Sequence, residues 1–559
     1  LSKPLILIFH FIPVMRFSKL FPTAFIFLIM LTACRQGNFE DTGMTVFRYN
    51  ESAGLTSLDP AFARDQANIW ATNQIFNGLV QLDENLKVKP CIAKSWEISG
   101  DGLTYTFQLR TDVQFHADPA FGKNKTRKVR ASDFVYSFNR LTDEKLASPG
   151  AWVLEKVSKG ENAFSAPNDS TFIIRLSAPF PPFAGLLSMQ YCSVVPHEAI
   201  EKYGSDFRQH PVGTGPFRFG MWKEGVKLVL LKNDHYFESG KDGPLPYLDA
   251  VAVTFIIEKQ SAFLEFIKGN LDFLSGIDAS YKDELLTNNG ELRSKYASSV
   301  NLSKQPYLNT EYLGILIDTS FDAAAKSPLK YQLIRQAISY GFDRVKMMRY
   351  LRNNIGKPGL AGFVPAGIPW FDQDMIEGYT YNPVKAMQLL EKAGYPGAKG
   401  LPTITLTTNA SYLDLCRYIQ SQLGEIGIHV KIDVTPPATL REMIAQSKVS
   451  FFRGSWIADY PDAENYLSLF YSPNFCPAGP NYTHYKSTLY DKLYNESTRE
   501  TNDSLRGLKY IQMDRLLMQD APVIILYYDE VLRFTRKNIS GLGSNPLNLL
   551  TLKQVKKTK

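Results

Sequence analysis

The fold is decided at residues 451–467, which have the sequence Phe451-Phe-Arg-Gly-Ser-Trp-Ile-Ala-Asp-Tyr-Pro-Asp-Ala-Glu-Asn-Tyr-Leu467. The stretch begins with a short apolar run that contains aromatic residues, and such a run predicts a buried strand. The run stops at an acidic and aromatic turn, residues 459–462. A carboxylate among aromatic side chains is costly unless a cation or several N–H donors meet it. This turn is therefore the first candidate for a functional site.

The segments before this stretch alternate between strand and helix. Apolar and β-branched residues predict strands at 403–408, 428–434 and 449–457, and helical apolar spacing predicts helices at 412–426 and 440–447. An alternation of this kind builds a parallel sheet with right-handed crossovers. Ligands of such open sheets bind beyond the carboxyl ends of the strands. Asp459 follows Ile457 at such an end, so the sequence predicts an α/β fold with a ligand site there.

Asp459 has two interpretations on spacing alone. It could cap a helix that Pro461 begins, because Asp and Pro are common at turns and helix starts. It could also receive the ammonium group of a ligand. Both interpretations stay open at this point.

Length and charge limit the functional class. A chain of 559 residues is too long for one core, so two or three domains are expected. The net charge of +7 includes Lys3, Arg16 and Lys19, and the remaining 59 basic and 55 acidic residues leave only +4. A net charge this small does not indicate a nucleic-acid-binding surface. The basic residues 123–130 are expected to form a solvated loop.

The first residues predict a targeting segment. A positive start at Met15-Arg-Phe-Ser-Lys19 precedes an apolar stretch at residues 20–31, which is typical of a secretory signal and too short for a comfortable membrane span. Because the sequence starts with Leu1, we expect Met15 to be the true start and residues 1–14 to be an upstream extension. Polar residues up to Gly43 predict a tether.

Residues 31–34, Leu-Thr-Ala-Cys, resemble a bacterial lipobox. The resemblance implies that residues 1–33 are removed and that Cys34 carries the lipid, which would anchor the protein to a membrane of the cell envelope or periplasm. An ordinary signal peptide with an incidental cysteine is the alternative.

The other cysteines and the histidines predict no cofactor and no metal. Cys91, Cys192, Cys416 and Cys476 are far apart and lack metal-ligand spacing. We expect them to be small buried hydrophobic residues, although a disulfide is not excluded. The seven histidines do not cluster.

Ten short motifs occur in order along most of the mature chain: Ser57-Leu-Asp-Pro, Ile75-Phe-Asn-Gly-Leu, Ile92-Ala-Lys-Ser-Trp-Glu, Asp101-Gly-Leu-Thr-Tyr-Thr-Phe, Val113-Gln-Phe-His, Ala131-Ser-Asp-Phe-Val-Tyr-Ser, Pro211-Val-Gly-Thr-Gly-Pro-Phe, Ile334-Arg-Gln-Ala-Ile-Ser-Tyr, Ala393-Gly-Tyr-Pro and Ala521-Pro-Val-Ile-Ile. In kind and order they resemble family 5 of the bacterial extracellular solute-binding proteins, the peptide- and nickel-binding receptors of ATP-binding-cassette importers. Each motif is weak alone, but their common order is specific.

The resemblance implies a periplasmic-binding-protein fold with two lobes joined by a hinge, parallel or mixed sheets, and an extra third domain in the first lobe. Its discontinuous boundaries would be residues 44–65, 205–300 and 530–559 for the core of the first lobe, 66–204 for the additional domain and 301–529 for the second lobe. The implied function is capture of an extended oligopeptide or dipeptide between the lobes. The implied partner is a membrane permease, with the receptor itself a monomer.

The resemblance also implies site residues. Trp456, Ile457 and Asp459 match a Trp-x-x-Asp motif whose acid meets the peptide ammonium, and Arg453 matches an arginine that can reach the peptide carboxylate. A solvent-exposed strand arginine is the alternative for Arg453. Further lining residues are expected at Ser455, where glycine is common, at Tyr460, at Gly54 and Leu55 in a peptide-pairing strand, and at Trp152, for which core packing is the alternative.

Three other functions remain to be weighed. A receptor for nickel or another small solute would share the same family. A hydrolase is less favoured, because no G-x-S-x-G, H-E-x-x-H or P-loop motif is present. An adhesin or structural lipoprotein would not be stabilised by any small ligand.

Overall fold

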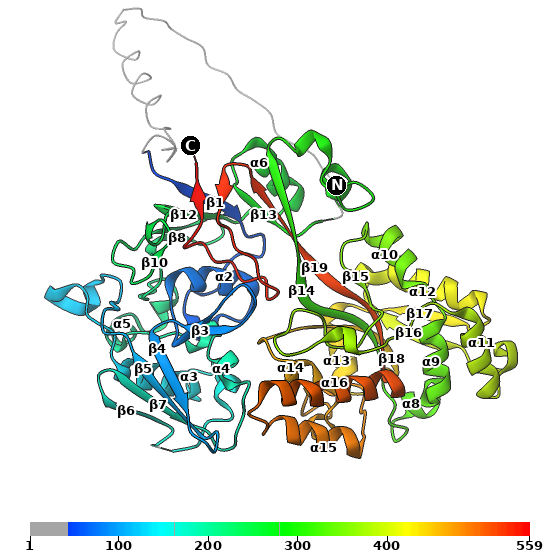
Figure 1. The fold of residues 1–559 in the computed structure, drawn as a ribbon. Helices are drawn as coiled ribbons and strands as arrows, with labels where there is room; N and C mark the ends of the chain where they lie inside the picture. Colours follow the sequence, from blue (N-terminus) through cyan, green and yellow to red (C-terminus); the bar gives the residue numbers. More distant parts are fainter. Residues whose placement is uncertain (1–42, 161, 279, 559) are drawn as a thin grey trace, which may run out of the picture. The chain divides into compact units, whose positions relative to one another are not determined.

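The computed structural model describes residues 43–160, 162–278 and 280–558. In that part of the chain one mixed sheet has eleven strands (Figure 1). Its order is β17 (Val430–Val434), β16 (Ile404–Thr408), β18 (Phe451–Ile457), β14 (Val300–Ile315), β19 (Val523–Arg536), β13 (Phe273–Ser275), β1 (Val46–Asn50), β12 (Ala250–Thr254), β9 (Lys227–Lys232) and β8 (Phe217–Lys223), while β15 (Lys357–Pro358) pairs with β19.

The predicted parallel αβ series forms one end of this sheet. β17 and β18 both pair in parallel with β16, in the order β17-β16-β18, which confirms the interpretation of residues 403–457. The crossovers are α12 (Leu413–Glu425) and α13 (Pro437–Ala445). α13 begins earlier than predicted, because Pro437 occupies the first helical turn, where its missing N–H costs nothing.

Two strands connect this end to the rest of the sheet. β14 and β19 are 16 and 14 residues long and run antiparallel to each other through its middle (Figure 1). β14 also pairs with β18, and β19 also pairs with β13. Residues 45–559 consequently form one compact unit.

A second sheet, β4 (Ala93–Ile98), β5 (Thr104–Leu109), β7 (Thr171–Arg175) and β6 (Phe164–Asn168), is antiparallel. α3 (Ala131–Thr142) packs on it, with Phe134 and Phe138 against Phe172. Ser132 and Asp133 are residue types that often cap helices, but both lie inside the first turn of this one.

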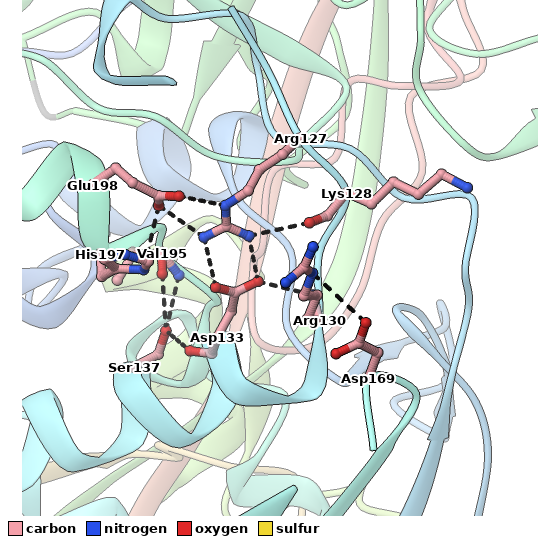
Figure 2. A network of polar contacts seen from close by, with 9 residues as sticks. All are labelled: Arg127, Lys128, Arg130, Asp133, Ser137, Asp169, Val195, His197 and Glu198. Atoms are coloured by element: carbon pink, nitrogen blue, oxygen red, sulfur yellow. Dashed lines mark hydrogen bonds and ion pairs between the residues drawn. The ribbon is translucent and has the colours of Figure 1, made fainter. Parts of the chain in front are cut away.

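Arg130 is the N-cap residue of α3, and Asp133 is the third residue of the helix. The Asp133 carboxylate accepts the backbone N–H of Arg130 at 2.8 Å and is held by both Nη atoms of Arg127, which also contacts Glu198 (Figure 2). Arg127 is therefore not part of a freely solvated basic loop. Its ion pairs with Asp133 and Glu198 fix its side chain instead.

The glycine-rich residues 212–216 form a close crossing with the end of α2 (Gln66–Ile75). A Cβ at Gly213 would lie 2.0 Å from the carbonyl oxygen of Ile75. Gly215 donates its backbone N–H to the same oxygen at 2.8 Å. Only a residue without a side chain permits this approach.

The remaining helices surround the two sheets. They are α4 (Phe183–Leu186), α5 (His197–Tyr203), α6 (Lys259–Lys268), α7 (Lys282–Leu285), α8 (Asp322–Ala325), α9 (Gln332–Tyr340), α10 (Arg344–Arg352), α11 (Pro383–Lys392), α14 (Glu464–Leu467), α15 (Thr488–Ser497) and α16 (Asp503–Asp520). Within the described ranges, no helix combines the length and hydropathy needed to cross a bilayer. The predicted signal segment, the lipobox and Cys34 lie outside the described residues.

Candidate ligand-binding site

β18 ends at the rim of the sheet and leads into residues 458–463, which we call the site loop. Phe451 and Phe452 are buried at its start, and exposure increases along the strand until Ile457 is 47% exposed. β16 pairs with β18 at Phe452, whereas β14 pairs along all of β18. The edge of Gly454–Ile457 that faces away from β14 therefore has no strand partner in the described sheet. This edge leads directly to Asp459.

Among the side chains that the structure describes, the Asp459 carboxylate has no cationic partner. Asn465 Nδ2 is 3.5 Å from Asp459 Oδ2, and no Lys, Arg or His nitrogen of the described residues forms an ion pair with it. Its side chain is reached by water, yet the surrounding protein desolvates it enough to raise the pKa of the carboxyl. Such a group gains free energy when a cation arrives.

Asn465 fixes the geometry of the loop. Its Oδ1 atom accepts the backbone N–H of Asp459 at 3.2 Å and the indole N–H of Trp456 at 2.9 Å. Asn465 is itself buried, in α14. One amide side chain thus holds two predicted site residues together. Asn465 was missed at the sequence level, because an asparagine in an apolar helix gives no specific signal.

The helix-cap alternative for Asp459 is wrong. α14 begins at Glu464, and the acceptor of its first free N–H is Asp462, whose Oδ1 is 2.9 Å from Glu464 N. Pro461 lies before the helix rather than at its first position. The carboxylate of Asp459 is left free for another partner.

The aromatic rings of Tyr460 and Trp152 contact each other. Trp152, in the short 3-10 helix Ala151–Leu154, is 40% exposed, and its ring centroid is 6.3 Å from that of Tyr460. The core-packing alternative for Trp152 is therefore wrong. Tyr460 is buried, and its hydroxyl donates to Glu464, as does that of Tyr494.

The N-terminal half of the chain also approaches Asp459. Burial raises the pKa of the Tyr191 phenol to about 12, and the negative charge of Asp459 adds to this shift. A Cβ on Gly185, in α4, would lie 3.5 Å from Pro461 Cδ. A cavity of about 620 Å³ lies beside this contact, lined by Gly185, Pro461 and Trp370 among others. The site loop therefore faces residues of the predicted additional domain.

Arg453 lies inside the protein, so the alternative of a solvent-exposed strand arginine is wrong. Its side chain is buried, forms an ion pair with Glu311 of β14 and lies over the ring of Tyr412 at 3.2 Å from the centroid. Its Nε atom has no hydrogen-bond partner among the described residues. Burial raises the pKa of Glu311, and the charge of Arg453 opposes this effect. A neighbouring cavity of about 780 Å³ is lined by Tyr412 and Asp529, and also by Glu51 and Ser52.

Gly54 and Leu55 are not in a strand. β1 ends at Asn50, residues 52 and 53 form a turn, and Gly54 has φ +72°, a conformation that favours glycine. A Cβ at Gly54 would meet nothing within 4 Å, so this backbone borders open space. Ser455 is half-buried and pairs with Glu311 in the register of β14 and β18.

Three comparisons with known proteins agree. Residues 87–475 match the family model of bacterial extracellular solute-binding proteins, family 5 middle. The glutathione-binding protein GsiB of Escherichia coli O6:K15:H31 (strain 536 / UPEC) is 24% identical over 502 residues, 88% of this chain and 91% of that protein.

Solved structures give the same fold. The periplasmic binding protein DppA from Helicobacter pylori, in complex with the peptide STSA, has a TM-score of 0.71 at 25% identity and covers 93% of this chain and 100% of its own. HbpA2 from Haemophilus parasuis has a TM-score of 0.79 at 21% identity, with 92% and 100% covered. The predicted α/β fold of the periplasmic-binding-protein type is confirmed.

Proposed function

Because the chain belongs to the bacterial extracellular solute-binding proteins of family 5, we propose that it captures a short extended peptide at Asp459 and delivers it to the permease of an ATP-binding-cassette importer. The matched relatives are named as binding proteins, and one was solved with a peptide. Binding rather than catalysis is accordingly the proposed role.

The observation that carries the proposal is the lone carboxylate of Asp459. The α-amino group of a peptide has a pKa of about 8 and is mostly cationic at neutral pH. It supplies the charge that Asp459 lacks among the described side chains. Asn465 holds the Asp459 backbone in place, so the acid is oriented before the ligand arrives.

The free edge of β18 supports the extended form of the peptide. Gly454–Ile457 offers backbone N–H and C=O groups on the side away from β14. A peptide that adds as a strand there gains affinity from backbone hydrogen bonds, whatever its side chains are. Its amino terminus would then meet Asp459, and Trp152 and Tyr460 would border its first residues.

The test is a pair of calorimetric titrations with synthetic tri- to pentapeptides, one pool with free and one with acetylated amino termini. The unsubstituted protein is expected to bind the free pool more tightly by about 10- to 100-fold, as for a hydrogen bond to a charged group worth ~1.5–3 kcal/mol. In Asp459→Asn this preference is expected to vanish.

Asp433→Asn is the matched control. Asp433 also lies near the carboxyl end of a parallel strand of the same sheet and is exposed. Within the described part of the chain, its carboxylate has a single side-chain contact, from the Thr435 hydroxyl at 3.5 Å. It should keep the preference for free amino termini. An equal loss in both variants, or equal binding of acetylated and free peptides by the unsubstituted protein, would contradict the role of Asp459.

Two parts of the proposal concern the whole receptor. The boundary between the lobes would lie near residue 300 on β14 and near residue 529 on β19. The register between the two strands is irregular from Pro306 to Thr310, opposite residues 528–530. Closure around this boundary predicts a smaller radius of gyration with the free peptide pool, measured by small-angle scattering.

Cys34 would hold the receptor to the membrane, so Cys34→Ala is expected to move it into the soluble fraction.

A further inference from the structure

A polar cluster with a thiol lies next to the loops that follow β14 and α13. Cys476 Sγ is 3.3 Å from His484 Nε2 and 3.3 Å from the hydroxyl of Ser447, which is itself 3.2 Å from the same ring nitrogen. The other ring nitrogen, His484 Nδ1, is 3.3 Å from Asp318 Oδ2. The four residues come from different parts of the chain. The proposed peptide site uses none of them.

The imidazole is oriented like a general base. The Asp318 carboxylate can only accept, so in the neutral imidazole it favours the proton on Nδ1, and the lone pair of Nε2 then faces Cys476. The ring is stacked on Phe475 at 4.4 Å between centroids and meets the edge of Phe321 at 4.9 Å. These contacts fix the ring plane. A nucleophile, a base and a group that orients the base are thereby aligned.

Two residues of the cluster have a left-handed backbone, Ser447 with φ +54° and His484 with φ +50°. For Ser447 this conformation ends α13, because the N–H groups of Ser447 and Lys448 donate to the last carbonyls of that helix. His484 follows no helix, so its left-handed backbone is a sparsely populated conformation beside the thiol.

The other described cysteines lack this environment. Burial raises the pKa of the Cys91, Cys192 and Cys416 thiols, and none of the three has an imidazole within hydrogen-bond distance in the described structure. Cys476 is also the one whose chain neighbours Pro477 and Ala478 are both exposed. Cys476 itself is 5% exposed, so only a small reagent is expected to reach its thiol.

We propose that Cys476 is a nucleophilic thiol that is oxidised by small uncharged hydroperoxides, with His484 as its general base and Asp318 as the positioning residue. The thiol proton passes to Nε2 as sulfur attacks the distal oxygen of the hydroperoxide. The O–O bond breaks, and the leaving alkoxide or hydroxide takes the proton from the imidazolium. Sulfur loses two electrons to become a sulfenic acid, and the peroxide gains them to become an alcohol or water.

The experiment treats the full-length chain with hydrogen peroxide for varied times. The peroxide is removed with catalase, and the protein is then unfolded in excess dimedone and iodoacetamide, so that access no longer limits labelling. Peptide mass spectrometry gives the fraction of sulfenic acid at each cysteine. Cys476 is expected to be oxidised at least about tenfold faster than Cys91, Cys192 and Cys416, which serve as internal controls.

Two variants test the roles of the base and its partner. His484→Gln is expected to slow the oxidation of Cys476 to the rate of the other cysteines, and Asp318→Asn to slow it partly. Ser447→Ala, with its melting temperature measured, reports whether loss of packing alone has this effect, and is expected to keep most of the rate. Equal oxidation of all four cysteines in the unsubstituted protein, which requires no variant, overturns the proposal. An unchanged rate in His484→Gln overturns it as well.

Discussion

The buried carboxylate of Asp514 predicts a specific dependence of protein stability on pH. This carboxylate is fully buried in α16, and its two oxygens accept the backbone N–H groups of Phe363 at 2.7 Å and Val364 at 3.1 Å. The Phe363 carbonyl in turn accepts the hydroxyl of Thr310, on β14, at 2.9 Å. Burial raises the pKa of Asp514 to about 7, and the two backbone donors only partly oppose this shift.

The sign of the pH effect follows from this shift. An unfolded Asp has a pKa of about 3.9, so between about pH 4 and pH 7 the folded state holds the proton that the unfolded state has lost. The stability that Asp514 contributes is therefore fully present below about pH 4 and is lost as pH rises through about 7. At ~1.4 kcal/mol per unit, the loss from about pH 5 to about pH 8 is of order 2–3 kcal/mol.

The assay compares the free energies of unfolding of the unsubstituted protein and Asp514→Asn in urea at the two pH values. Asparagine cannot accept both N–H groups, so the variant starts less stable at about pH 5 by roughly 1–3 kcal/mol. Because asparagine does not titrate, this gap is expected to close or reverse at about pH 8. A gap of equal size at both values, with Asp433→Asn as the control, would refute the assignment of the titration to Asp514.

Three further predictions concern the site itself. Arg453→Met should destabilise the protein by about 3–5 kcal/mol, because it leaves Glu311 buried without its partner, and Arg453→Met with Glu311→Leu should recover most of this loss in urea unfolding. Trp152→Ala should weaken binding of the free peptide pool in calorimetry while changing the melting temperature little, because the ring is 40% exposed. The raised pKa of Asp459 predicts that peptide affinity falls as pH falls and the carboxylate is protonated, and this dependence should be absent from Asp459→Asn.

The parts of the fold that could be predicted are those fixed by local pattern. The strands at Ile404–Thr408 and Phe451–Ile457 and the helix Leu413–Glu425 follow apolar periodicity, and their parallel order follows from the handedness of crossovers. The place of Asp459 beyond the end of β18 follows from the same reasoning. The role of Asn465 could not be predicted, because it depends on how α14 folds back on the loop.

The burial of Arg453 could have been predicted from the strand pattern. Phe451 and Arg453 are two residues apart in a strand, so their side chains share a face, and the burial of Phe451 implies that of Arg453. A buried arginine requires an acid, and Glu311 is the one charged residue within β14 from residue 308 to its end. Asp529 and Glu530 of β19 satisfy the same condition. Only the register of the sheet selects among these three acids. It sets Leu313 opposite Arg453, so Glu311 is the next residue of β14 on the same face. Because Glu311 and Arg453 are 142 residues apart in sequence, local pattern cannot give this register.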